Sequence, residues 1–156
     1  MKGRLHGFTL IELVVTISII AILAAVALPR YISLQTQARA AKMQAIYGGI
    51  RSAAMLAHAQ AIATGTTAAA TILMEGTTIN QVNGYPTADA PGIILALQLS
   101  GTNDQVTISA GGAAAGSTIT IDINGATTAA NCRVSYTSAL AGGSPAISLP
   151  VVPDCS

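Results

Sequence analysis

A long apolar run opens the chain and determines the first predicted element. Residues 8–28 are apolar except at Thr9, Glu12, Thr16 and Ser18. An α-helix rises about 1.5 Å per residue, so this segment would be roughly 31 Å long, which matches a bilayer hydrocarbon core of about 30 Å. The pattern therefore predicts a membrane-spanning helix at residues 8–28.

Pro29 interrupts the helical pattern directly after this run. Proline removes one backbone hydrogen bond and clashes with the preceding turn, at a cost of about 3 kcal/mol in a regular helix. We expect a kink or local melting there. Two alternatives stay open: residues 18–28 become extended in an assembled state, or the helix simply bends where it leaves the membrane.

Helical periodicity returns after Pro29 and predicts an amphipathic helix at residues 29–64. Its apolar positions recur at spacings of three and four: Met43, Ile46, Tyr47, Ile50, Ala54, Ala57 and Ala61. The polar residues around them, which include Arg39 and Lys42, are interpreted as a solvated face. Gly48 and Gly49 inside this helix indicate either the close approach of another backbone or a flexible point.

Gly65 ends the helical pattern, and short strands and turns follow. Alternation predicts a hairpin at residues 70–82 around Glu75 and Gly76, strands at 105–109, 117–123 and 133–137, and a short helix at 93–99. Asn83-Gly84, Asn124-Gly125 and Gly142-Gly143 are predicted turns. The predicted fold class is α+β, with a long N-terminal helix packed on a small antiparallel β-sheet domain at residues 65–156.

Charge and motifs argue against several function classes. Seven basic and six acidic residues nearly cancel, so the chain lacks the basic surface that neutralises nucleic-acid phosphates. The sequence shows no motif for a catalytic triad or a phosphate-binding glycine loop, and we expect neither an enzyme nor a cofactor. His58 has no second metal-binding residue at ligand spacing, so we expect no metal site and place His58 at a surface or interface.

Glu12 is the polar group in the apolar run that most needs an explanation. An ionisable side chain inside a membrane span is costly even on lenient insertion scales, and a disposable signal peptide has no use for it. A helix that later packs against a partner with a positive charge has a use for such a carboxylate. A secretory signal peptide cleaved after Ala27 is the alternative, because Ala25-Val26-Ala27 has the small-x-small form.

The first residues resemble the leader and cleavage motif of type IV prepilins and the related pseudopilins. A short basic leader ends in Gly7, Phe8 follows directly, Glu12 is the fifth residue after that glycine, and the apolar run continues downstream. The resemblance implies that a prepilin peptidase removes residues 1–7 by cleaving between Gly7 and Phe8. It also implies N-methylation of the Phe8 amine, and pairing of this amine with Glu12 of a neighbouring subunit.

What the resemblance implies about function is a structural subunit of a type IV pilus-like extracellular filament, for attachment or motility. Residues 8–28 would hold the precursor in the inner membrane and then, together with Pro29, pack in the filament core. The implied partners are identical subunits in a helical filament, the prepilin peptidase/methyltransferase and the pilus assembly machinery. A pseudopilin of a type II secretion system, which shares the leader and the helix, is the alternative.

A finer resemblance concerns the segment after Pro29. Residues 29–65, with Leu34-Gln35 and Ala38-Arg39-Ala40, are similar to pilins of the mannose-sensitive haemagglutinin type, and Gly84-Tyr85-Pro86 adds to the similarity. The resemblance fades after about Gly92.

Cys132 and Cys155 are the only cysteines in the chain. In the oxidising compartment beyond the membrane they predict a disulfide that closes the C-terminal loop, worth about 3 to 4 kcal/mol in the chain-entropy model. Similar C-terminal disulfide loops occur in type IV pilins, whereas major pseudopilins typically carry clustered acidic calcium ligands instead. The cysteine pair therefore favours the pilin.

Overall fold

A computed structural model describes residues 7–148 and 155 of the chain. The chain divides into two compact units, Met1–Gln35 and Thr36–Ser156, and each is described by itself. The predicted leader lies outside the described residues except for Gly7. The same is true of residues 149–154 and 156 of the predicted C-terminal domain.

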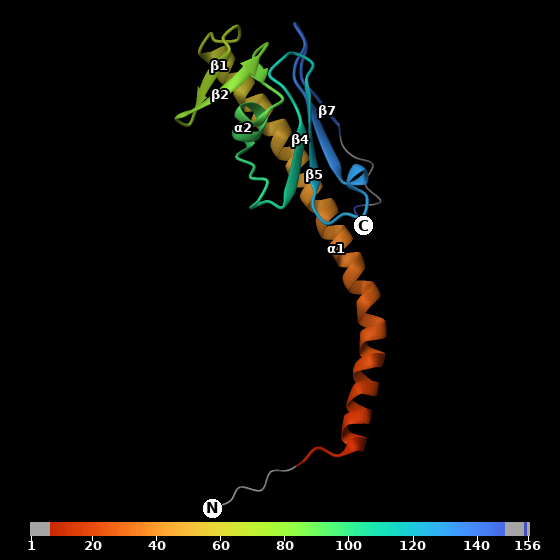
Figure 1. Cartoon of the computed structure of the whole chain (residues 1–156). Helices are drawn as coiled ribbons and strands as arrows, with labels where there is room; N and C mark the ends of the chain where they lie inside the picture. Colours follow the sequence, from red (N-terminus) through yellow and green to blue (C-terminus); the bar gives the residue numbers. More distant parts are fainter. Residues whose placement is uncertain (1–6, 149–154, 156) are drawn as a thin grey trace, which may run out of the picture. The chain divides into compact units, whose positions relative to one another are not determined.

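One helix, α1, runs from Leu10 to Ala63 and contributes to both units (Figure 1). Pro29 lies inside α1 and residues 18–28 are helical, so the expected local melting at Pro29 is not found. Proline removes a single N–H donor, while its neighbours keep their own i to i−4 hydrogen bonds. The helical segments on both sides of Pro29 therefore stay continuous as one helix.

Helix α1 ends in a Schellman motif at Gly65. The Gly65 N–H donates to the Ile62 carbonyl oxygen at 3.1 Å, and the Thr66 N–H donates to the Ala61 carbonyl oxygen at 2.8 Å. Gly65 has a φ of +67°, which glycine adopts at little cost because it has no Cβ. The predicted helix end is confirmed.

Two antiparallel sheets follow α1, and in both the spatial order of the strands is their order in the chain. The first contains β1 (Thr71–Met74), β2 (Thr77–Val82) and β3 (Tyr85–Pro86); the second contains β4 (Val106–Ala110), β5 (Thr118–Ile123), β6 (Arg133–Thr137) and β7 (Ala146–Ser148). A π-helical turn η1 (Ala90–Ile94) and the short helix α2 (Leu95–Leu97) lie between the sheets, and a 3₁₀ turn η2 (Ala129–Asn131) precedes β6.

The hairpin predicted around Glu75 and Gly76 is confirmed. Strands β1 and β2 pair in register up to Met74 opposite Thr77. Both turn residues have positive φ, 46° and 80°, as a type I′ turn requires. The three further predicted strands correspond to β4, β5 and β6, whereas the helix predicted at 93–99 is η1 followed by α2. Strands β3 and β7 are too short to show alternation.

The core of the second unit lies against the apolar face predicted on α1. Met43, Ile46, Ile50, Ala54, Ala57 and Ala61 are buried, and Tyr47 is half-buried. The first part of this face packs with Ile119, Ile121, Val134 and Tyr136 of the four-stranded sheet, and Ala57 and Ala61 pack with Ile72 and Ile79 of the β1–β2 hairpin. Both sheets therefore cover one stripe of α1 (Figure 1).

The interpretation of Arg39 and Lys42 as part of a solvated face is wrong. Arg39 Nη1 donates to the Cys155 carbonyl oxygen at 3.2 Å, and Lys42 Nζ donates to the Asp104 carbonyl oxygen. Helical spacing alone cannot separate a solvent-facing residue from one at the edge of the buried stripe, where a long side chain reaches a covering loop. Both residues tie α1 to loops of the second unit.

The structure places another residue close to Gly49, so a close approach and not a flexible point explains this glycine. A Cβ at Gly49 would lie 2.7 Å from Leu97 Cδ1, whereas a Cβ at Gly48 would meet nothing within 4 Å. The neighbour is thus a side chain of α2 and not another backbone. His58 is also an interface residue, because its ring stacks on Tyr85 with centroids 4.0 Å apart and its Nδ1 lies 2.9 Å from the Gly84 carbonyl oxygen.

Candidate assembly site

The first turn of α1 holds the carboxylate that stands out in the sequence. The backbone N–H and the hydroxyl of Thr9 donate to Glu12 Oε2 at 2.9 and 2.6 Å, and the Glu12 N–H donates to Thr9 Oγ1 at 3.3 Å. This reciprocal arrangement is a capping box with Thr9 as the N-cap. The Thr-x-x-Glu spacing of Thr9 and Glu12 carries its signature, so the capping role could be found from sequence.

The capping box leaves part of the Glu12 carboxylate available. Both side-chain bonds go to Oε2, and among the described residues no hydrogen bond reaches Oε1. A carboxylate offers about four acceptor sites on its two oxygens. It also stands at the N-terminal end of α1, where the helix dipole favours negative charge. The site can therefore accept one further donor, such as an amine.

Gly7 and Phe8 lie directly before this cap. The Phe8 ring is 78% exposed, and a Cβ built at Gly7 would meet nothing within 4 Å. The peptide bond between them is therefore accessible in this structure. Phe8 directly precedes the N-cap Thr9 and Glu12 lies in the first turn of α1, whereas Pro29 lies seventeen residues after Glu12, about 25 Å along the helix axis. Pro29 is thus not part of the same site.

The first unit presents an exposed apolar surface along residues 8–28. All residues from 7 to 35 are exposed. The apolar part of α1 is long and apolar enough to cross a membrane, with a mean hydropathy of 2.7 over eighteen residues. Thr16 Oγ1 donates to the Glu12 carbonyl oxygen at 2.6 Å, and Ser18 Oγ donates to the Val14 carbonyl oxygen at 2.7 Å. These polar groups are satisfied within the helix, as an apolar environment requires.

The predicted disulfide is confirmed in the second unit. Cys132 and Cys155 are bonded, with their Cα atoms 4.9 Å apart, and both residues are buried. The bond connects the start of β6 to the residue whose carbonyl oxygen accepts the Arg39 hydrogen bond. Within residues 7–148 and 155, no group of three or more His, Cys, Asp or Glu side chains is placed to hold a metal ion.

The polar contacts within the sheets are structural. Tyr136 is fully buried and its hydroxyl donates to the Pro86 carbonyl oxygen at 2.7 Å, which joins the two sheets. Burial raises the pKa of Tyr136 above its ordinary value. Arg133 pairs with Asp122 on the neighbouring strand at 2.6 Å, and this hydrogen bond raises the pKa of the Arg133 guanidinium.

Known proteins share the N-terminal features. Residues 4–28 match the prokaryotic N-terminal methylation motif, so the exposed apolar helix carries a type IV pilin signal. Over 58 residues the chain is 48% identical to the type IV narrow pilus major component PilA5 of Thermus thermophilus, a match that covers 37% of this chain and 50% of that protein. The chain thus spans about half the length of this curated relative. No solved structure matches the chain.

These similarities define the matched part of the chain as homologous to a type IV pilin. The similarities indicate that the chain is a structural subunit and not an enzyme. The finer resemblance to mannose-sensitive haemagglutinin pilins stays a prediction.

Proposed function

We propose that the protein is the structural subunit of a type IV pilus-like extracellular filament. One observation carries the proposal: the segment with the methylation motif forms an apolar helical stretch, and every residue from 10 to 28 in it is exposed. Apolar surface in water costs roughly 25 cal/mol per Å². The helix therefore needs a cover, which the inner membrane supplies to the precursor and identical subunits supply in the filament.

Processing at Gly7 and Phe8 follows from the same proposal. A prepilin peptidase cleaves between them and the new Phe8 amine is methylated, so residues 1–7 are lost and the apolar helix is kept. The accessible Gly7–Phe8 bond and the methylation motif across residues 4–28 support this step. The pilus assembly machinery then extracts the processed subunit into a filament that serves attachment or motility.

Glu12 carries a negative charge that must be paired with a cation when the subunits assemble. Once the apolar helix is surrounded by others, the carboxylate lies in a poorly solvated environment and requires a cation. The Phe8 amine of a neighbouring subunit provides one, and the unoccupied Glu12 Oε1 can accept it. The capping box holds the carboxylate in place for this contact.

The test separates pairing from capping with two variants of the full chain. Glu12→Ala removes both roles, whereas Thr9→Ala removes the N-cap side chain and keeps the carboxylate. We expect Glu12→Ala to be inserted and cleaved but to lose most extracellular filaments, and Thr9→Ala to assemble. Sheared filaments are quantified, and mass spectrometry reads the N-terminus, its methylation and the state of both cysteines.

Each outcome has a distinct meaning. Abundant wild-type chains that start at methylated Phe8 support the pilin. If the processed chain stays in the cell envelope and is absent from sheared material, the proposal fails and the pseudopilin alternative replaces it. If Thr9→Ala loses as many filaments as Glu12→Ala, the carboxylate acts through the cap and intersubunit pairing is refuted.

A further inference from the structure

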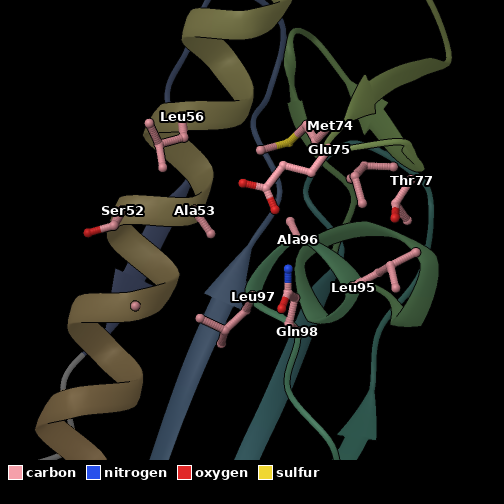
Figure 2. A pocket seen from close by; sticks show the side chains of 12 residues that line it. Ser52, Ala53, Leu56, Met74, Glu75, Thr77, Leu95, Ala96, Leu97 and Gln98 are labelled. Atoms are coloured by element: carbon pink, nitrogen blue, oxygen red, sulfur yellow. The ribbon is translucent and has the colours of Figure 1, made fainter.

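A groove in the second unit lies between α1, the β1–β2 hairpin and α2 (Figure 2). It has a volume of about 390 Å³, and its lining includes the apolar side chains of Leu56, Met74 and Leu97. Figure 2 shows the Glu75 carboxylate pointing from the β1–β2 turn into the space between α1 and α2. The groove is therefore largely apolar and carries one negative charge.

The other flank of α1 carries a complementary surface. Arg51 and Met55 lie one helical turn apart and are exposed, Met55 at 62%. They line a second hollow together with Tyr47, Tyr85 and Pro145. We call Arg51 and Met55 the basic patch. It combines one positive charge with a thioether side chain that adapts readily to an irregular apolar surface.

The groove and the basic patch lie on opposite sides of the buried stripe. Ile50 is fully buried, Gly49 lines the groove, and Arg51 belongs to the basic patch. Successive residues on an α-helix are about 100° apart, so Gly49 and Arg51 lie about 100° to either side of Ile50. A neighbouring molecule can thus approach each surface independently.

The charged side chains of the two surfaces are the ones in the second unit that make no hydrogen bond among the described residues. Its other described charged side chains have partners in the chain: Arg39, Lys42, Asp89, Asp104, Asp122 and Arg133. Within the described residues, Glu75 and Arg51 have no hydrogen bond or ion pair. One anion and one cation therefore remain available for an external contact.

We propose that, in the filament, the basic patch of one subunit docks into the Glu75 groove of the next, with an ion pair between Arg51 and Glu75. This inference rests on the proposed filament function. Two different surfaces that complement each other form a heterologous contact, which can repeat without closing and so builds a helical polymer. The ion pair fixes the register, and Met55 fills the groove beside Leu56 and Met74.

Cysteine cross-linking tests the contact in assembled filaments. Arg51→Cys with Glu75→Cys places one thiol on each surface, so oxidation of filaments should produce ladders of covalent multimers on non-reducing gels. The native disulfide joins residues of one chain and gives no ladder. Ala59→Cys with Glu75→Cys is the matched control, because Ala59 is exposed on α1 outside both surfaces.

Charge reversal provides an independent measurement. Arg51→Glu and Glu75→Arg should each lower filament yield severalfold, and the combined exchange should restore it. Glu75→Asn should also lower the yield without harming the hairpin, because asparagine suits the positive φ at this turn position.

The outcomes distinguish the contact from the function that it serves. Three results refute the docking contact while the proposed filament function stands: the wild type forms filaments but the Arg51→Cys, Glu75→Cys chain gives no ladder, the Ala59 control gives an equal ladder, or the single charge reversals leave the filament yield unchanged. If the wild-type chain forms no filaments, the proposed function and the docking contact both fail.

Discussion

The adjacent glycines of α1 allow a matched test of how α1 packs against α2. Gly48→Ala adds a methyl group where nothing lies within 4 Å, whereas Gly49→Ala places a Cβ 2.7 Å from Leu97 Cδ1. Both substitutions gain the same helix propensity, about 0.8 to 1 kcal/mol. Any difference between the two variants therefore measures the contact with Leu97.

The structure determines the expected size of that difference. A Cβ to carbon distance of 2.7 Å is too short, so Leu97 must move. Extra methylene-sized groups in a packed site typically cost about 1 to 3 kcal/mol. Leu97 is only half-buried, which allows its side chain to turn and favours the low end of this range. We expect Gly48→Ala to stabilise by about 1 kcal/mol. Gly49→Ala should be neutral or destabilise by about 1 kcal/mol.

The assay is denaturant unfolding of the full chain in detergent micelles, followed by tyrosine signals of the second unit because the chain has no tryptophan. If a substitution changes only the stability, the denaturant midpoint shifts while the slope of the unfolding free energy against denaturant concentration stays the same. A double-mutant cycle with Leu97→Ala adds the control, since truncating Leu97 should remove the penalty of Gly49→Ala. If both glycine variants are equally stabilised, the close approach of Leu97 to α1 is refuted.

Three further predictions concern the second unit. Tyr136→Phe keeps the buried ring and removes the hydrogen bond to Pro86, so the free energy of unfolding should fall by about 1 to 3 kcal/mol in denaturant titrations, and an unchanged midpoint would contradict this. Burial raises the pKa of Tyr136 above its ordinary 10.0, so the folded state holds the hydroxyl proton to higher pH than the unfolded state does. The contribution of Tyr136 to the free energy of unfolding is therefore fully present below pH 10 and is lost as the pH rises above 10. The fall in stability above pH 10 should be smaller in Tyr136→Phe. Replacing both Cys132 and Cys155 by serine should cost about 3 to 4 kcal/mol through the loop of 23 residues, measured as faster proteolysis, and equal protease resistance would exclude this contribution.

Features set by neighbouring residues were predictable from the sequence. The β1–β2 hairpin depends on alternation and on two turn residues with positive φ, and the end of α1 depends on Gly65. The apolar face of α1 could likewise be read from its spacing. Each of these is decided within a few residues of chain, where local preference and packing agree.

Features set by distant partners were not predictable. Lys42 and Arg39 donate to carbonyl oxygens 62 and 116 residues away. The sequence of their own helix does not indicate that those loops fold over it. Strand β7 has three residues and is defined by its pairing with β6. Pro29 shows the reverse case, since a strong local breaker is overridden by the helical run on both sides.

The candidate site was partly visible. Glu12 stands out because a carboxylate interrupts an apolar run, but its bond to Thr9 requires the Thr-x-x-Glu spacing to be read as a cap. The relation between Arg51 and Glu75 cannot be read from sequence, because it depends on which charges the folded unit leaves without partners.

The strand order of both sheets has a consequence for how the second unit forms. Within each sheet, every strand pairs with the strand before or after it in the chain, so each strand after the first of its sheet follows a partner that is already synthesised. Such sequential pairing keeps contact order low and allows folding to proceed from one end of the chain to the other. Cys155 comes after all described strands, so the disulfide can close only after β6 has been synthesised. The bond then ties Cys155 to the residue directly before β6, so the covalent link is made after all the strands that it holds are present in the chain.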